Sequence, residues 1–186
     1  MSNSNEKLCL ACGLCCNGVI FADVQLQPTD DAKKLEALGL KLIFSGKNLR
    51  RGGESAPPIR AKFLQPCAAL QGCTCEIYTE RPRYCRQFEC ALLQKVSAGE
   101  TSMTEALRTV QQALRRVEKV KNLLRALGDT NEEIALRKRF QRVQMRFELG
   151  ANSDKANELF ADLSNAMHEL NISLSENFYP GTDQKD

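Results

Sequence analysis

The chain of 186 residues contains no tryptophan and a single histidine, His168. A lone histidine with no cysteine or serine motif beside it argues against a Cys–His catalytic dyad and against a histidine-rich metal site. The sequence also has no glycine-rich phosphate loop, no HExxH and no GxSxG. It therefore does not favour a classical enzyme.

Long apolar runs are absent as well. No stretch approaches the ~18 apolar residues of a membrane span, and residues 1–7 are polar, without the apolar segment of a secretory signal. We therefore expect a cytoplasmic protein without a membrane segment. The net charge of +3 is too small to indicate a polyanionic partner by itself.

Cysteine is missing after residue 90 and abundant before it. All nine cysteines and five of the six prolines lie in residues 1–90, whereas residues 91–186 show helical periodicity almost throughout. We therefore divide the chain into a cysteine-cluster metal-binding module, residues 1–90, and a segment of three helices, residues 91–186.

Four cysteines stand close together at the start of the chain: Cys9, Cys12, Cys15 and Cys16. A CxxC spacing lets two sulfur atoms turn toward one ion, and in a reducing cytoplasm clustered thiols bind metal more often than they form disulfides. Adjacent side chains usually diverge. Cys15 and Cys16 therefore fit better as ligands of two metals, or with one sulfur bridging.

The number of cysteines is compatible with more than one metal centre. Two tetrahedral zinc sites would use eight of the nine. Iron–sulfur ligation is the alternative, because the bacterial ferredoxin motif begins with the same CxxCxxC spacing. The Cys-Pro that ends that motif is missing here. Thiolates are soft ligands that bind both zinc and iron–sulfur centres, so the ligand type does not distinguish between these two alternatives.

The fold expected from these patterns is mainly α. In the first part, alternation over 20–26 predicts a strand, Pro28-Thr29-Asp30-Asp31 predicts the start of a short helix that Gly39 ends, and 45–58 form a loop. In the second part, capping boxes at 102–105 and 130–133 and a cap at Asn152 or Ser153 begin three helices. Their short connections predict antiparallel neighbours.

Basic residues gather in two places. Residues 41–62 carry a net positive charge, and Arg139, Arg142 and Arg146 share one face of the second long helix. No aromatic side chains are interleaved with these charges, so the pattern does not favour nucleic acid. A protein partner bound through the C-terminal helices remains an alternative.

The cysteine spacing as a whole resembles the CxxCxxCC cysteine-cluster family (YkgJ-like), which is described as zinc- or iron-chelating. The resemblance rests on the opening cluster, on Pro66-Cys67-x2-Leu70, and on the run from Cys75-Glu76-Ile77-Tyr78 through Arg81-Pro82 to Cys85-Arg86-x-Phe88. It implies the following metal ligands: Cys9, Cys12, Cys15, Cys16, Cys67, Cys75, Cys85 and Cys90. Cys73 lies outside the pattern and is a candidate extra ligand.

Three further residues of that run are candidates to support the thiolates. Pro82 suits the first turn of a helix that would contain Cys85. Arg81 and Arg86 could donate hydrogen bonds to sulfur and offset its charge, or form a solvated basic surface. Tyr78 could lie over the site or belong to the core.

These observations predict a zinc- or iron-chelating protein with about two zinc ions, or with iron or an iron–sulfur cluster. Flagellin lysine-methylating proteins contain a similar cysteine domain, which makes an iron–sulfur redox or protein-methylating enzyme one alternative. A metal-stabilised adaptor for a protein or nucleic-acid partner is the other.

Overall fold

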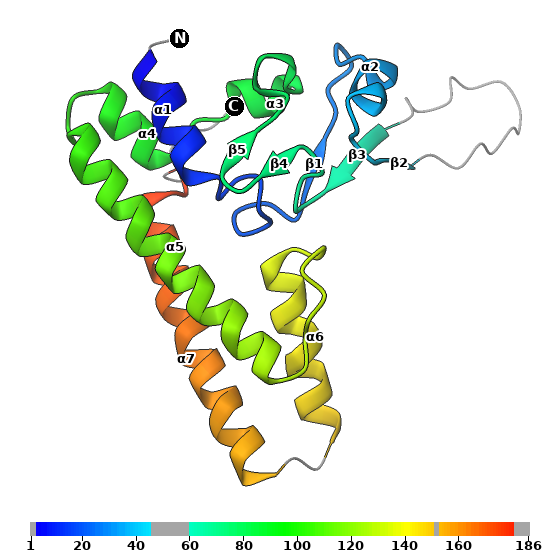
Figure 1. The fold of residues 1–186 in the computed structure, drawn as a ribbon, viewed down its shortest axis with the longest axis vertical. Coiled ribbons are helices and arrows are strands. Elements are labelled where there is room, and N and C mark those ends of the chain that lie inside the picture. Colours follow the sequence, from blue (N-terminus) through cyan, green and yellow to red (C-terminus); the bar gives the residue numbers. More distant parts are fainter. Residues whose placement is uncertain (1–2, 46–59, 151–152, 181–186) are drawn as a thin grey trace, which may run out of the picture.

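The computed structural model describes residues 3–45, 60–150 and 153–180, and these residues are mainly helical, as the sequence predicts. Figure 1 shows the cysteine-rich part gathered at one end of a pair of long helices. The helices are α1 (Asn3–Cys12), α2 (Ala32–Ala37), α3 (Arg83–Gln87), α4 (Ala91–Ser97), α5 (Met103–Ala126), α6 (Leu136–Leu149) and α7 (Asp154–Asn177). The strands are β1 (Asp23–Gln25), β2 (Leu42–Ser45), β3 (Arg60–Leu64), β4 (Leu70–Gln71) and β5 (Thr74–Cys75).

The helix pair is formed by α5 and α7, which run antiparallel along most of their length (Figure 1). The predicted capping box begins α5, because the Ser102 hydroxyl accepts from the Glu105 N–H and the Glu105 carboxylate accepts from the Ser102 N–H. Ser153 caps α7 in the same way, through the Ala156 N–H. The apolar stripes of both helices are buried against each other, as their 3–4 spacing predicts.

The second long helix, α6, begins later than the sequence predicts. The second predicted capping box does not form a cap, and α6 starts at Leu136, whose N–H donates to the Gly18 carbonyl at 2.9 Å. The side chain of Asn131 instead accepts from the Glu133 N–H, which makes a local turn. The connection leads back along α5, so that α6 runs in the same direction as α5 and antiparallel to α7 (Figure 1). The fully antiparallel arrangement is therefore not confirmed.

Arginines of α6 hold this connection in place. Arg139 is buried and donates through Nε to the Asp129 carboxylate at 2.9 Å and through Nη2 to the Asp129 carbonyl at 2.8 Å. Arg142 also donates to the Asp129 carboxylate, and Arg146 donates to the Leu127 carbonyl. The three arginines share one face, as predicted, but that face points to the connection.

The first part of the chain contains more strands than the sequence predicts. β3 pairs antiparallel with β1 on one side and with β2 on the other. The predicted strand over 20–26 is reduced to β1. Strands β2 and β3 flank residues 46–59, so most of the predicted 45–58 loop and of the basic segment lies outside the described residues. α2 forms as predicted, with Asp31 as its cap and Leu35 buried.

Two hydrophobic cores result, and the cysteines lie between them. The first core joins Leu8 and Leu14 to α4, α5, α6 and α7. The second core lies under the small sheet and contains Val24, Phe63 and Ile77. Since α1 packs on α5 (Figure 1), the two parts of the chain share one core, and the division at residue 90 stays a prediction.

Candidate metal centre

The opening cysteine cluster is formed by the end of α1 and the turn that follows it. Cys9 and Cys12 lie in the last turn of α1, and Cys15 and Cys16 follow in the turn that leaves it. Gly13 makes this turn possible with φ +64°, and a Cβ at this position would lie 3.1 Å from the Cys73 Cα. The backbone N–H groups of Cys16 and Gly13 close the turn through the carbonyls of Gly13 and Cys9.

The remaining cysteines reach the same region from other elements. Cys67 precedes the β4–β5 hairpin and Cys75 ends it, paired with Leu70. Cys85 lies within α3, as predicted, and Cys90 is the residue that precedes α4. Cys73 lies in the hairpin turn against Gly13.

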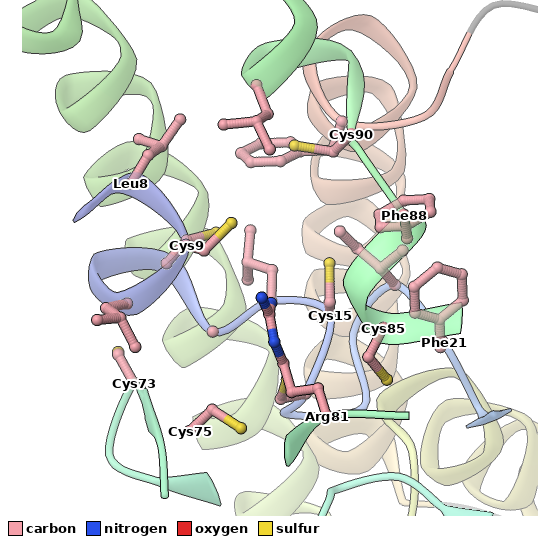
Figure 2. Close-up of a pocket in the computed structure, with 18 of the residues that line it drawn as sticks. Leu8, Cys9, Cys15, Phe21, Cys73, Cys75, Arg81, Cys85, Phe88 and Cys90 are labelled. Atoms are coloured by element: carbon pink, nitrogen blue, oxygen red, sulfur yellow. The ribbon is translucent and has the colours of Figure 1, made fainter. Parts of the chain in front are cut away.

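These thiols line a single pocket with mostly apolar walls (Figure 2). All nine cysteines are partly buried and none forms a disulfide. Eight of them line the pocket, and the ninth, Cys67, packs against the second core together with Cys75 and Cys85. His168 is exposed on α7. The sequence-predicted ligands are therefore neighbours in space.

The side chains share the pocket without converging on one point. Within 3–45, 60–150 and 153–180, no three Cys, His, Asp or Glu side chains are close enough to enclose an ion. The donor set nevertheless has the chemistry of a metal site, because partly buried thiols without disulfides are the ligands that zinc and iron take in proteins.

Burial of the thiols in this pocket disfavours their ionised form. Burial and the neighbouring thiols raise the pKa of Cys9 from its usual value near 9 to about 11. The same causes raise the pKa of Cys12, Cys16 and Cys85 to about 12 and that of Cys15 well above its usual value. The thiols are therefore protonated at neutral pH unless a cation compensates their charge.

Backbone N–H groups already point at several of the sulfur atoms. Donors stand two residues after Cys12, Cys67 and Cys75, and each of them lowers the pKa of its thiol. Cys90, at the start of α4, accepts from the Leu92 and Leu93 N–H groups. Such bonds stabilise a thiolate, and they offset part of the cost of its burial.

Of the three predicted supporting residues, Arg81 faces the thiols. Its guanidinium lies 3.6 Å over the Tyr78 ring, its Nε donates to the Tyr78 carbonyl at 2.8 Å, and its charge lowers the pKa of Cys9 and Cys16. Tyr78 also lines the pocket. Arg86 is exposed on α3.

Two parts of the pocket wall are missing from the sequence interpretation. Phe21 packs edge-on against Phe88, with ring centroids 4.8 Å apart, and against Tyr84. Gln65 is buried in the wall, and its Oε1 has no hydrogen-bond partner within the part of the chain that the structure describes. The apolar character of Phe21 and the position of Gln65 before Pro66-Cys67 were the available signals.

A mainly α chain with nine free thiols gathered between two cores belongs to the class of cysteine-cluster proteins. The comparison with known families agrees: residues 8–109 match the CxxCxxCC family, described as "Putative zinc- or iron-chelating domain", and the chain belongs to this family. No curated protein and no solved structure matches it. None of the described helices is both long and apolar enough to cross a membrane.

Proposed function

We propose that this protein chelates zinc or iron in the cytoplasm through a cluster of thiolates. The ligands are Cys9, Cys12, Cys15, Cys16, Cys67, Cys75, Cys85 and Cys90. The observation that carries the proposal is their proximity as free and partly buried thiols: seven of the eight line one apolar pocket, and Cys67 packs against the second core beside Cys75 and Cys85.

The residues that surround the thiols support this role. Backbone N–H groups supply partial positive charge where thiolates would form, and Arg81 supplies a full positive charge there. Leu14, Phe21 and Phe88 limit access of water to the sulfur atoms. A bound metal ion would supply the charge that the protein itself lacks there, and would connect the two cores.

The first test is an anaerobic purification followed by elemental analysis for zinc, iron and acid-labile sulfide. We expect about two zinc ions per chain, as eight thiolates at four per ion require, or iron in comparable amount. The Cys12→Ser/Cys67→Ser variant should hold less metal, whereas Cys73→Ser should hold as much as the unaltered chain. A metal-free chain that also fails to take up Zn²⁺ or Fe²⁺ would contradict the proposal.

An iron–sulfur centre in a redox or protein-methylating enzyme is the second candidate. The arrangement of four cysteines favours this candidate. Cys9, Cys12 and Cys15 lie at the end of α1 and in the turn that follows it, and Cys90 lies across the pocket from them. The absorption spectrum separates the two candidates, because Zn²⁺ is d¹⁰ and colourless. Iron with stoichiometric sulfide and a brown colour would favour the second.

A further inference from the structure

We propose that the eight thiols form two separate sites of four, joined only by the peptide bond between Cys15 and Cys16. The first site consists of Cys9, Cys12, Cys15 and Cys90, and the second of Cys16, Cys67, Cys75 and Cys85. The inference rests on the proposed function and assigns each ligand to an ion.

Packing against the two cores divides the cysteines first. Cys9, Cys12 and Cys90 pack against the core that α1 shares with the long helices. Cys67, Cys75 and Cys85 pack against the core under the small sheet. Each core therefore has three thiols packed against it, and each set lacks one thiolate of the four that a tetrahedral ion takes.

Cys15 and Cys16 supply the missing thiol of each set. The Cys16 carbonyl accepts from the Cys67 N–H at 2.7 Å, which fixes Cys16 beside the second set. In Figure 2 the sulfur of Cys15 points toward the part of the pocket where those of Cys9 and Cys90 lie. The sulfurs of Cys75 and Cys85 lie at the opposite end, with the Arg81 side chain between the two groups.

The test compares two double variants that differ by one position in the chain. Cys9→Ser/Cys15→Ser removes two ligands of the first site and leaves the second intact. Cys9→Ser/Cys16→Ser damages both. Zn²⁺ is added to the metal-free chain and then withdrawn with increasing concentrations of a chelator. We expect the first variant to keep half of the zinc at the affinity of the unaltered chain and the second variant to keep none at that affinity.

Equal behaviour of the two variants would overturn the assignment. Cys73→Ser serves as the control, since Cys73 belongs to neither set. If the unaltered chain takes up no zinc or iron, the proposed function itself fails. If it takes up metal but the two variants act alike, only the division into two sites fails.

A second measurement uses the unaltered chain and does not depend on the variants folding. The metal-free chain receives one equivalent of Zn²⁺, the free thiols are alkylated, and the half-loaded molecules are fragmented in a mass spectrometer. We expect one of Cys15 and Cys16, and not both, to be protected in each half-loaded molecule. Protection of both in the same molecule, or loading without a half-loaded species, would indicate one shared cluster and overturn the proposal.

Discussion

Gly13 is the residue on which the geometry of the cysteine turn depends most. Its φ of +64° falls in the left-handed region, and its Cα faces the backbone of Cys73 so closely that a Cβ would lie 3.1 Å from the Cys73 Cα. A side chain at this position would adopt an unfavourable backbone conformation. It would also contact the backbone of Cys73, which would have to shift by a few tenths of an ångström. The turn positions Cys15 and Cys16 at once, so its distortion reaches both sets of thiols.

We therefore expect Gly13→Ala to destabilise the protein and to lower its metal retention. The left-handed conformation alone costs an L-residue about 1–2 kcal/mol, and the close contact adds to that. Urea denaturation of the metal-free chain measures the first effect, and chelator competition measures the second.

Gly72→Ala is the matched control for this substitution. Gly72 also has a positive φ, +59°, but nothing lies within 4 Å of a Cβ there. It should show the conformational penalty without the contact and should retain metal. If both variants lose metal equally, the close approach of Gly13 to Cys73 has no part in holding the thiols.

Metal binding should release protons, because the thiols of the metal-free pocket are protonated at neutral pH. The pKa values of Cys9 and Cys12 lie at about 11 and about 12, so each thiolate formed at pH 7 gives up one proton. We expect about four protons per ion. Addition of Zn²⁺ in weak buffer with a pH indicator counts them.

The pH dependence of metal affinity follows from the competition between protons and the metal for sulfur. Metal affinity should rise with pH throughout the range below these pKa values and fall as acid returns protons to sulfur. In the metal-free chain the thiol pKa values are raised above the unfolded value near 9, so stability should decrease as pH rises above about 9. Metal uptake independent of pH would contradict thiolate ligation.

The α5–α6 connection is held by one buried carboxylate. Asp129 and Arg139 are both almost completely buried, and Arg142 binds the same carboxylate. Removing one partner of a buried ion pair leaves the other charge uncompensated, which costs about 3–5 kcal/mol. We therefore expect Asp129→Ala to lower the free energy of unfolding by that order, as measured by urea denaturation.

An exposed ion pair between α5 and α7 is the control. Lys119 and Glu169 join α5 to α7 at 3.6 Å, with both side chains more than half exposed. Glu169→Ala should cost less than about 1 kcal/mol. Similar losses in the two variants would show that the buried pair does not hold the connection.

The sequence predicts those elements whose signals are local. Ser102 and Ser153 begin their helices because capping depends on residues three apart, and Asp31 begins α2 in the same way. The predicted capping box that begins at Thr130 has the same S/T-x-x-E pattern but does not form a cap. Asp129 just before it is taken by arginines ten and thirteen residues later, which no local pattern reveals. The strands β2 and β3 pair across a long connection and were missed for the same reason.

For the site, the cysteine spacing predicts that the cysteines lie close together but not that they pack against two different cores. Spacing places Cys9, Cys12 and Cys15 together, and the resemblance adds the more distant cysteines. The packing of Cys67, Cys75 and Cys85 against a second core could not be predicted, because it depends on a sheet of which the sequence indicates only the strand that becomes β1. The places of Phe21 and Gln65 in the pocket wall could not be predicted for the same reason.

The whole molecule contains a large core, which α1 shares with the long helices, and a smaller second core at the cysteine-rich end. Among the described residues the second core contains six buried residues, whereas the first extends along α5 and α7. The thiols lie where the two meet. A metal that binds there connects them, so its removal should loosen the cysteine-rich end and leave the long helices largely intact.

Hydrogen exchange before and after chelation measures this difference. We expect faster exchange in the β4–β5 hairpin and α3, with little change in the middle of α5 and α7, and a far-UV circular dichroism spectrum that keeps most of its helical signal. The Cys12→Ser/Cys67→Ser variant should show the same pattern without a chelator. Unchanged exchange in the hairpin would show that metal has no structural part there.

X-ray absorption at the zinc or iron edge of the protein as purified tests ligation by the clustered thiols, because it identifies the atoms bound to the metal. We predict sulfur as the ligand atom, with four sulfurs per ion at about 2.3 Å if the metal is zinc. A first shell of nitrogen and oxygen would contradict ligation by the clustered thiols, whatever the metal content.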